Sequence, residues 1–227
     1  MNAREPTLLS ADAAGIDRAV ALLADGNVIA APTDTVYGIA ARLDRPDALH
    51  NLFRAKGRPE AKAIPVLVGD SGFALDLTAS PESLSALAGA FWPGALTIVT
   101  AARPGLPPEV ITFGDGGGET IALRLPDSEI MRTLCRRSGG ALAVTSANAS
   151  GEPPATSAEG TVAAGLRHLV AIVDGGQTPG PLPSTIVSVA GDRLKVIREG
   201  ILSSERVTTV WQGVNSGAVE RGMISSL

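Results

Sequence analysis

Aromatic residues, cysteine and histidine are all scarce in this 227-residue chain: aromatics make up 3%, and there are one cysteine and two histidines. The single cysteine, Cys135, excludes an internal disulfide, which is consistent with a reducing compartment. It lies in an expected helix over 129–137, where a small buried residue is favoured over a nucleophile. With so few aromatics, the core has to be built from Ala, Val, Leu and Ile.

Long apolar runs are missing as well. No segment approaches the roughly 18 consecutive apolar residues of a membrane span, and residues 1–6 lack the apolar centre of a signal peptide. We therefore expect a soluble, cytoplasmic protein that does not enter a membrane. The net charge of −4 argues against broad, salt-driven binding of nucleic acid, although it leaves room for a local basic site.

Hydrophobic residues nevertheless make up 44% of the chain, and the 26 glycines and 16 prolines predict many tight turns. Residues 1–10 are expected to be a lead-in, 11–202 one domain, and 203–227 a polar, partly disordered tail. The Pro- and Gly-rich segment 101–119 predicts a mobile loop. Helices are expected over 12–24, 46–55, 72–77, 81–90, 127–138 and 157–166, and strands over 27–31, 64–68, 95–100, 120–125, 141–144, 169–173, 186–189 and 193–198.

The segment Thr145–Gly151 combines small polar residues in an unusual place. It follows the apolar run 141–144, which predicts a buried strand, and Pro153 and Pro154 end the regular structure after it. Hydroxyl and amide groups at the carboxyl end of a strand could hold a polar ligand. The same residue types also form ordinary turns for purely local reasons, so this segment alone leaves both interpretations open.

Three cationic side chains stand at positions that need an explanation. Lys56 and Arg58 follow the helix expected over 46–55, where they either complement its dipole or converge on one phosphate or carboxylate. Arg124 lies near the end of an apolar strand, where an unpaired charge would be costly. Either a bound anion or a structural Asp or Glu would satisfy it.

The segment 33–38 is polar at alternate positions, which predicts a strand along a sheet edge with Thr33 and Thr35 on one face. The familiar nucleotide-binding fingerprints are absent: the chain has neither the Gly-x-Gly-x-x-Gly pattern nor a P-loop. A nucleotide, if the protein binds one, would have to be held by some other arrangement.

Taken in order, several stretches resemble the YrdC-type (threonylcarbamoyl-AMP synthase) family. No stretch is specific alone, but their common order is a strong signal, and they span roughly residues 15–202. The stretches are Pro32–Gly38, Lys56–Pro59, Phe91–Thr97, Arg124–Pro126, Thr145–Gly151, Pro183–Val187 and Ile197–Gly200.

The resemblance implies a single α/β domain: a twisted, open, mixed β-sheet with flanking helices around a large, concave, positively charged cavity. It also implies a reaction in which L-threonine, bicarbonate and ATP give L-threonylcarbamoyl-AMP and pyrophosphate. The product would pass to the proteins of the tRNA-threonylcarbamoyl transferase complex, which modify adenosine 37 of tRNA. Mg²⁺ would bridge the ATP phosphates without a dedicated protein site.

The resemblance assigns roles to eleven positions of this sequence. The catalytic signature falls on Lys56, Arg58, Ser146 and Asn148. The residues expected at L-threonine are Thr33, Tyr37, Arg124, Ser146 and Ser184. The residues expected at ATP are Lys56, Arg58, Glu60, Asn148, Thr156 and Arg198.

This sequence departs from the family at two points. The run Lys62–Pro65 carries its proline at a shifted position, which puts contacts from that strand in doubt, and only about 25 residues follow the core, so we expect the short form without an extra C-terminal domain. One alternative is a YrdC-like protein that binds tRNA or double-stranded RNA weakly without this activity. Another is a former of carbamoyl-adenylate, which the short length and single cysteine disfavour.

Overall fold

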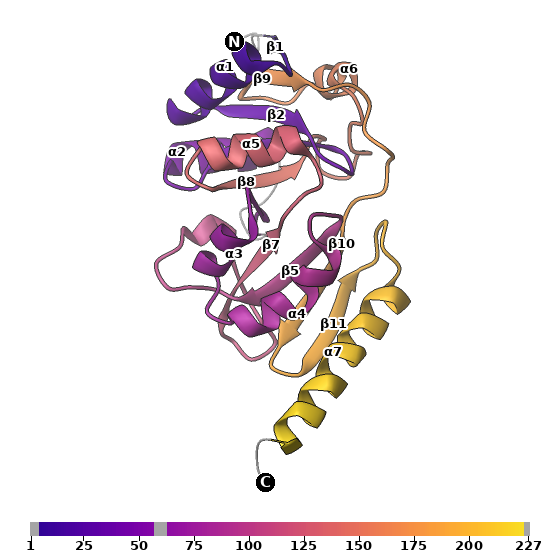
Figure 1. The fold of residues 1–227 in the computed structure, drawn as a ribbon. Coiled ribbons are helices and arrows are strands. Elements are labelled where there is room, and N and C mark those ends of the chain that lie inside the picture. The colour runs from indigo at the N-terminus through magenta and orange to yellow at the C-terminus, as the bar shows by residue number, and fades with distance from the viewer. Residues whose placement is uncertain (1–4, 57–62, 225–227) are drawn as a thin grey trace.

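The computed structural model of the protein describes residues 5–56 and 63–224 (Figure 1). Its helices are α1 (Ala13–Ala24), α2 (Pro46–Lys56), α3 (Ser71–Leu77), α4 (Pro81–Phe91), α5 (Glu129–Arg137), α6 (Ala158–Ala163) and α7 (Ser204–Ile224), with a 3-10 turn η1 (Pro108–Val110). Its strands are β1 (Thr7–Ser10), β2 (Val28–Pro32), β3 (Tyr37–Arg42), β4 (Val66–Val68), β5 (Leu96–Ala101), β6 (Ile111–Phe113), β7 (Glu119–Arg124), β8 (Ala141–Ser146), β9 (Leu169–Asp174), β10 (Thr185–Ala190) and β11 (Arg193–Arg198).

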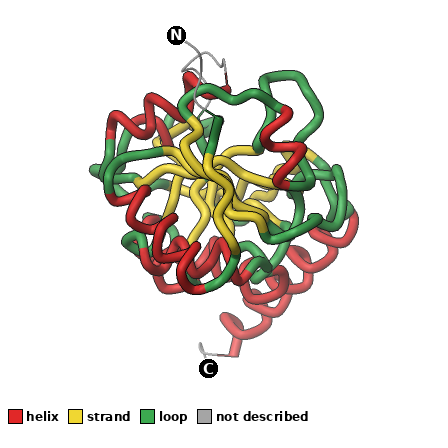
Figure 2. Tube along the Cα trace, turned by 90° about the horizontal axis from the view of Figure 1, so that it is seen from above, coloured by secondary structure: helices red, strands yellow, loops and turns green. Residues whose placement is uncertain are grey.

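In the described part of the chain, these strands form one mixed sheet. Its order is β1-β9-β2-β3-β8-β4-β7-β5-β10-β11, with β6 added beside β7. The sheet contains both antiparallel pairs, such as β3 with β8, and parallel pairs, such as β4 with β7. Figure 2 shows the strands fanning out as the sheet twists. The α/β class and the mixed sheet predicted from the sequence are confirmed.

Helices cover both faces of the sheet, and β2 is apolar and buried at every position. Successive side chains of a strand point to opposite faces, so Ala30 joins the core with α2 and α4, whereas Ile29 and Ala31 join the core with α1 and α5. The run 141–144 of β8 divides in the same way. A strand buried on both faces therefore explains the continuous apolar runs in the sequence.

Side-chain caps fix where several helices begin. Asp12, expected as the first residue of the helix, is instead its cap: its Oδ1 accepts a hydrogen bond from Gly15 N at 2.9 Å at the start of α1. The cap of α5 is Ser128 rather than the predicted Asp127. Asp44, predicted to cap α2, instead pairs with Arg42 at 2.7 Å, and that hydrogen bond holds the pKa of Asp44 below its ordinary value.

Three segments are more regular than their sequences predict. Residues 7–10, expected as part of a lead-in, form β1 and pair with β9 at the edge of the sheet. Residues 111–113, inside the expected mobile loop, form β6 against β7. Residues 204–224, expected as a tail, form α7, which packs on α4 and β11. Short strands and weakly apolar helices gain their stability from such tertiary contacts, which local patterns do not reveal.

Two anchors hold α7 against the rest of the molecule. Val207 and Trp211 are buried, and the guanidinium of Arg206 lies 5.6 Å from the ring centroid of Phe91 in α4. The spacing of four residues places both anchors on one side of the helix. Neither α7 nor any other helix within the described residues is long and apolar enough to cross a membrane.

The thiol of Cys135 is expected to be unreactive in the folded protein. Cys135 is fully buried in α5 and donates to Leu67 O at 3.4 Å, and burial raises its pKa to about 12. A thiol reagent at pH 8 should label it only after unfolding, because the thiolate is the nucleophile. In the unfolded chain the thiol ionises near pH 9.0, whereas in the folded protein it stays protonated up to about pH 12. The free energy of unfolding should therefore fall as the pH rises through this range. Rapid labelling of the native protein would contradict this burial.

Candidate functional site

The ammonium group of Lys56 joins segments that are far apart in the sequence. Lys56 Nζ donates to Ser146 O and to Asn148 Oδ1, both at 2.8 Å, and lies 3.2 Å from Ser146 Oγ. Ser146 and Asn148 are 90 and 92 residues away from Lys56 in the sequence. Lys56 ends α2 and is only 5% exposed. Besides complementing the dipole of α2, Lys56 therefore places its positive charge at the carboxyl end of β8.

Asn148 uses its whole amide to shape the loop after β8. While Oδ1 accepts from Lys56, Nδ2 donates to Ala149 O at 2.9 Å and to Glu152 O at 2.6 Å. The backbone of Ala147 bonds to both Tyr37 and Ala155. The sequence left open whether Thr145–Gly151 is a simple turn. It is a turn at the end of a strand, but one built on a buried cation.

A cavity of about 360 Å³ lies beside this loop. Its lining is formed by Ala147, Asn148, Ala149, Glu152, Pro153, Ala155, Gly160, Ala163 and Ala164. Within the described part of the chain this lining includes one acid, Glu152, and no base.

Residues 33–36, between β2 and β3, form a hydrogen-bonded turn. Of the edge strand predicted for residues 33–38, only Tyr37 and Gly38 lie in a strand, and that strand, β3, is inside the sheet. Thr33 Oγ1 accepts from Thr35 N at 3.1 Å and from Val36 N at 3.2 Å, and it donates to Val36 O at 2.6 Å. Thr33 Oγ1 and Thr35 Oγ1 are 3.0 Å apart. Both threonines are buried, so the turn is rigid and presents the side chain of Asp34 in a fixed direction.

Arg124, at the end of β7, finds its partners in this turn. Its Nη2 donates to Asp34 Oδ1 at 2.5 Å, its Nη1 to Thr35 Oγ1 at 3.3 Å, and its Nε to Gly94 O at 3.0 Å. Arg124 is 5% exposed. Of the two alternatives left open by the sequence, a structural acid is therefore present, and it is Asp34.

Sheet twist explains how β7 reaches the β2–β3 turn. Neighbouring strands rotate by roughly 20–25°, so the sheet turns by about 90° over the four steps from β2 through β3, β8 and β4 to β7. A flat sheet would place the carboxyl ends of β7 and β8 at opposite edges, because the two strands are antiparallel. In the structure the end of β7 nevertheless contacts this turn, through Arg124.

A second group of side chains lies where β5 and β10 begin. Ser184 Oγ and Thr97 Oγ1 are 2.9 Å apart, and both residues are buried. Arg198 Nη2 donates to Ser184 O at 2.7 Å. Gly94 precedes this group, and a Cβ there would lie 2.5 Å from Phe91 O, so only glycine fits without a shift.

Tyr37 and Thr156 hold the loop between β9 and β10. Tyr37 is fully buried, and its hydroxyl donates to Gly176 O at 2.8 Å and accepts from Gly175 N at 3.2 Å. Burial raises the pKa of this hydroxyl. Thr156 Oγ1 accepts from Gln177 Nε2 at 2.8 Å. In this structure Tyr37 supports the site from the core rather than lining an open surface.

The structure thus joins most of the predicted site residues into three contact groups, whereas Tyr37 and Thr156 contact the loop between β9 and β10. The first is Lys56 with Ser146 and Asn148, the second is Arg124 with the turn after Thr33, and the third is Ser184 with Arg198. Arg58 and Glu60 lie outside the described residues. The sequence gave no role to Asp34, Thr97 or Gln177. Asp34 and Thr97 stand inside the matching stretches 32–38 and 91–97, which was the available signal.

Comparison with known proteins shows which protein family the chain belongs to. The model of a protein family described as Telomere recombination (Sua5, YciO and YrdC) matches residues 21–200. The chain belongs to this family. The match includes all the site residues discussed above.

Two relatives and one solved structure place the chain within the Sua5/YciO/YrdC family. A protein of Bacillus subtilis named threonylcarbamoyl-AMP synthase is 38% identical over 204 residues, which are 89% of this chain and 58% of the relative. A protein of the same name from Pyrococcus abyssi is 35% identical over 195 residues, or 85% of this chain and 56% of the relative. The crystal structure of P. abyssi Sua5 complexed with L-threonine superposes with a TM-score of 0.81 and 30% identity, covering 90% of this chain and 60% of that one.

Each of these proteins is considerably longer than the part that matches. The chain spans 58% and 56% of the two relatives and 60% of the solved structure. The similarity therefore establishes the family and its fold. The activity of the whole relatives enters below as a proposal for this chain.

Proposed function

We propose that the protein is an L-threonylcarbamoyladenylate synthase, a nucleotidyltransferase that forms threonylcarbamoyl-AMP and pyrophosphate from L-threonine, bicarbonate and ATP. The observation that carries the proposal is the buried ammonium of Lys56 fixed on Ser146 and Asn148. Two relatives named for this activity, and a related structure complexed with L-threonine, support it.

The reaction has two chemical steps. The amine of threonine and bicarbonate give a carbamate and water, and a carbamate oxygen then attacks the α-phosphate of ATP so that pyrophosphate leaves. Both reactants of the second step are anions. The protein must therefore position them and offset their repulsion, which is how enzymes usually accelerate such transfers.

The proposed division of labour follows the chemistry of the side chains. Lys56 and Arg58 offset phosphate charge, while the forked guanidinium of Arg124 binds the threonine carboxylate. Hydroxyl and amide groups orient the two substrates. Those proposed at threonine are Thr33, Ser146 and Ser184, with Tyr37 in support, and those proposed at ATP are Asn148, Thr156, Arg198 and Glu60.

Mg²⁺ is proposed to arrive bound to the phosphates of ATP. The described residues include no group of three or more His, Cys, Asp or Glu side chains that could hold a metal ion. The donor set present here is hydroxyl, amide and cation, which suits phosphate and carboxylate groups rather than a hard divalent ion. When bound, the ion would neutralise part of the phosphate charge.

One incubation tests the proposal. The purified chain is mixed with ATP, Mg²⁺, labelled bicarbonate and L-threonine, and the products are separated. We expect pyrophosphate and labelled threonylcarbamoyl-AMP in equal amounts, both dependent on threonine. Pyrophosphate without a threonine-dependent product, or no turnover at all, would refute the assignment. The proteins proposed to receive the product, those of the tRNA-threonylcarbamoyl transferase complex, are left out of this assay.

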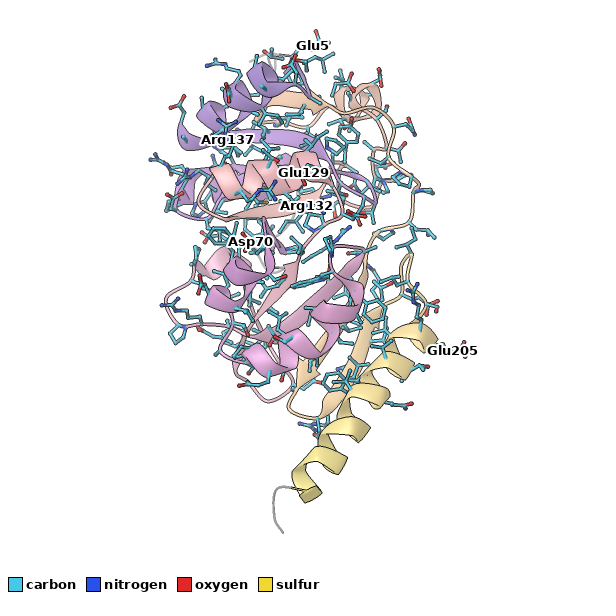
Figure 3. All side chains as sticks on the ribbon, viewed as in Figure 1. Glu5, Asp70, Glu129, Arg132, Arg137 and Glu205 are labelled. Atoms are coloured by element: carbon cyan, nitrogen blue, oxygen red, sulfur yellow. The ribbon has the colours of Figure 1, made fainter. Side chains whose placement is uncertain are left out.

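Binding of tRNA or double-stranded RNA without catalysis is the competing interpretation, and the surface of α5 does not favour it. Its arginines already have acidic partners. Arg132 bonds to Glu129 at 3.0 Å, two residues that Figure 3 labels on α5, and Arg137 bonds to Asp17 at 2.7 Å. Hydrogen bonds from Arg132 and then Arg136 hold the pKa of Glu129 below its ordinary value. These cations are therefore largely neutralised on a chain whose net charge is −4.

A further inference from the structure

Asp34 is the residue of the site whose role neither the sequence nor the family resemblance defines. Its side chain is 14% exposed, and it contacts the 6%-exposed side chain of Arg124. Only Oδ1 is engaged, by Arg124 Nη2 at 2.5 Å. The other oxygen, Oδ2, has no hydrogen-bond partner within residues 5–56 and 63–224. A carboxylate held by one oxygen, with the other uncommitted and the side chain partly open to solvent, can accept a ligand.

The donors of Arg124 are also only partly used. A guanidinium carries five N–H groups. Gly94 O takes the one on Nε, Thr35 Oγ1 takes one on Nη1, and Asp34 takes one on Nη2. One N–H on each terminal nitrogen therefore has no partner among the described residues. Two donors on adjacent nitrogens match the two oxygens of a carboxylate.

We infer that Asp34 and Arg124 together bind the head group of an α-amino acid, with Asp34 accepting the α-amino group. In such a zwitterion a single carbon separates the ammonium from the carboxylate, so a carboxylate already bonded to the guanidinium lies next to the ammonium. This inference rests on the proposed function, which supplies L-threonine as the amino acid. It goes further by naming the group that recognises the amine.

The assignment also fits the chemistry of the amine. An ammonium donates three hydrogen bonds, and the neutral amine that reacts with bicarbonate still donates two. Asp34 can therefore hold the nitrogen in both protonation states and direct its lone pair away from the carboxylate. The rigid turn, fixed by the hydrogen bonds of Thr33 Oγ1, keeps Asp34 in place during this change.

A ligand pair separates this role from a purely structural one. L-threonine is compared with 3-hydroxybutyrate, which keeps the carboxylate and the hydroxyl but lacks the α-amino group. Dissociation constants are measured by calorimetry or NMR for the wild type and for Asp34→Asn. We expect the wild type to prefer threonine by about 10- to 100-fold, the worth of one charge-assisted hydrogen bond. In the variant this preference should fall to within about threefold.

The outcomes are distinct. Equal weakening of both ligands would mean that Asp34 only orients Arg124, and an unchanged preference would mean that Asp34 does not meet the amine. Either result overturns the inference and leaves the proposed function standing. A wild type that binds no threonine overturns both. Asp44→Asn, which removes a carboxylate paired with Arg42, is the matched control and should keep the wild-type preference.

A second variant guards against loss of folding in Asp34→Asn. Asp34→Glu keeps the negative charge beside Arg124 but moves the carboxylate by one methylene group. It should remain folded by circular dichroism and weaken threonine at least fivefold more than 3-hydroxybutyrate. If Asp34→Glu binds both ligands as the wild type does, the carboxylate does not recognise the amine and the inference is refuted.

Discussion

Lys56→Met is expected to lower the rate of threonylcarbamoyl-AMP formation by about 100- to 1,000-fold, the usual loss on removing one preorganised charge from a reacting site. Methionine has a similar length, so the change removes the ammonium and leaves most of the volume. In the wild type that ammonium is fixed on Ser146 and Asn148. Initial rates under saturating ATP and threonine measure the effect.

Two further variants make the result for Lys56 interpretable. Lys195→Met removes an exposed lysine that pairs with Asp115 at the surface, and its rate should stay within twofold of the wild type. Arg58→Ala is expected from the family resemblance to abolish the product while leaving the fold intact. Near-normal activity in Lys56→Met, or in Arg58→Ala, would show that the catalytic signature is wrongly assigned.

Arg124→Met is expected to destabilise the protein by about 3–5 kcal/mol, because it leaves the carboxylate of Asp34 largely buried without its counter-ion. The pair is 6% and 14% exposed, so water screens little of this loss. In a chain of 227 residues the change corresponds to a melting temperature lower by roughly 10 °C. Thermal unfolding followed by circular dichroism measures it.

A double variant tests the cause of that loss. Asp34→Asn/Arg124→Met removes both charges, so it should be more stable than Arg124→Met alone, since no buried charge is left unpaired. Asp44→Ala breaks the more exposed pair with Arg42 and should cost no more than about 1 kcal/mol. A double variant less stable than Arg124→Met would show that Asp34 is stabilised by something other than this arginine.

Most of the regular structure was predictable because its signals are local. The helix expected over 12–24 and the strands expected over 141–144, 186–189 and 193–198 all form. The strand β1 and the helix α7 were not predicted. The stability of β1 comes from pairing with β9, and that of α7 comes from packing its buried Val207 and Trp211 against the rest of the molecule. Such contacts leave little trace in a short stretch of sequence.

In the candidate site, too, some features were predictable from the sequence and others depend on tertiary contacts. The order of the matching stretches predicted that Lys56, Ser146 and Asn148 belong to one site, and the structure places these three residues in contact. It did not predict that Arg124 pairs with Asp34, or that residues 33–36 form a turn. A turn held by one buried threonine hydroxyl has the same alternating polarity as an edge strand, so the pattern alone could not separate the two.

By itself the sequence determined the family, the class of fold and the chemical character of the site, because these depend on which residues occur and in what order. The tertiary structure decided which charges meet. Arg124 and Asp34 are 90 residues apart, and β7 and β8 run in opposite directions. Their contact depends on how the strands from β2 to β7 pair and twist within one sheet, and no single segment encodes that arrangement.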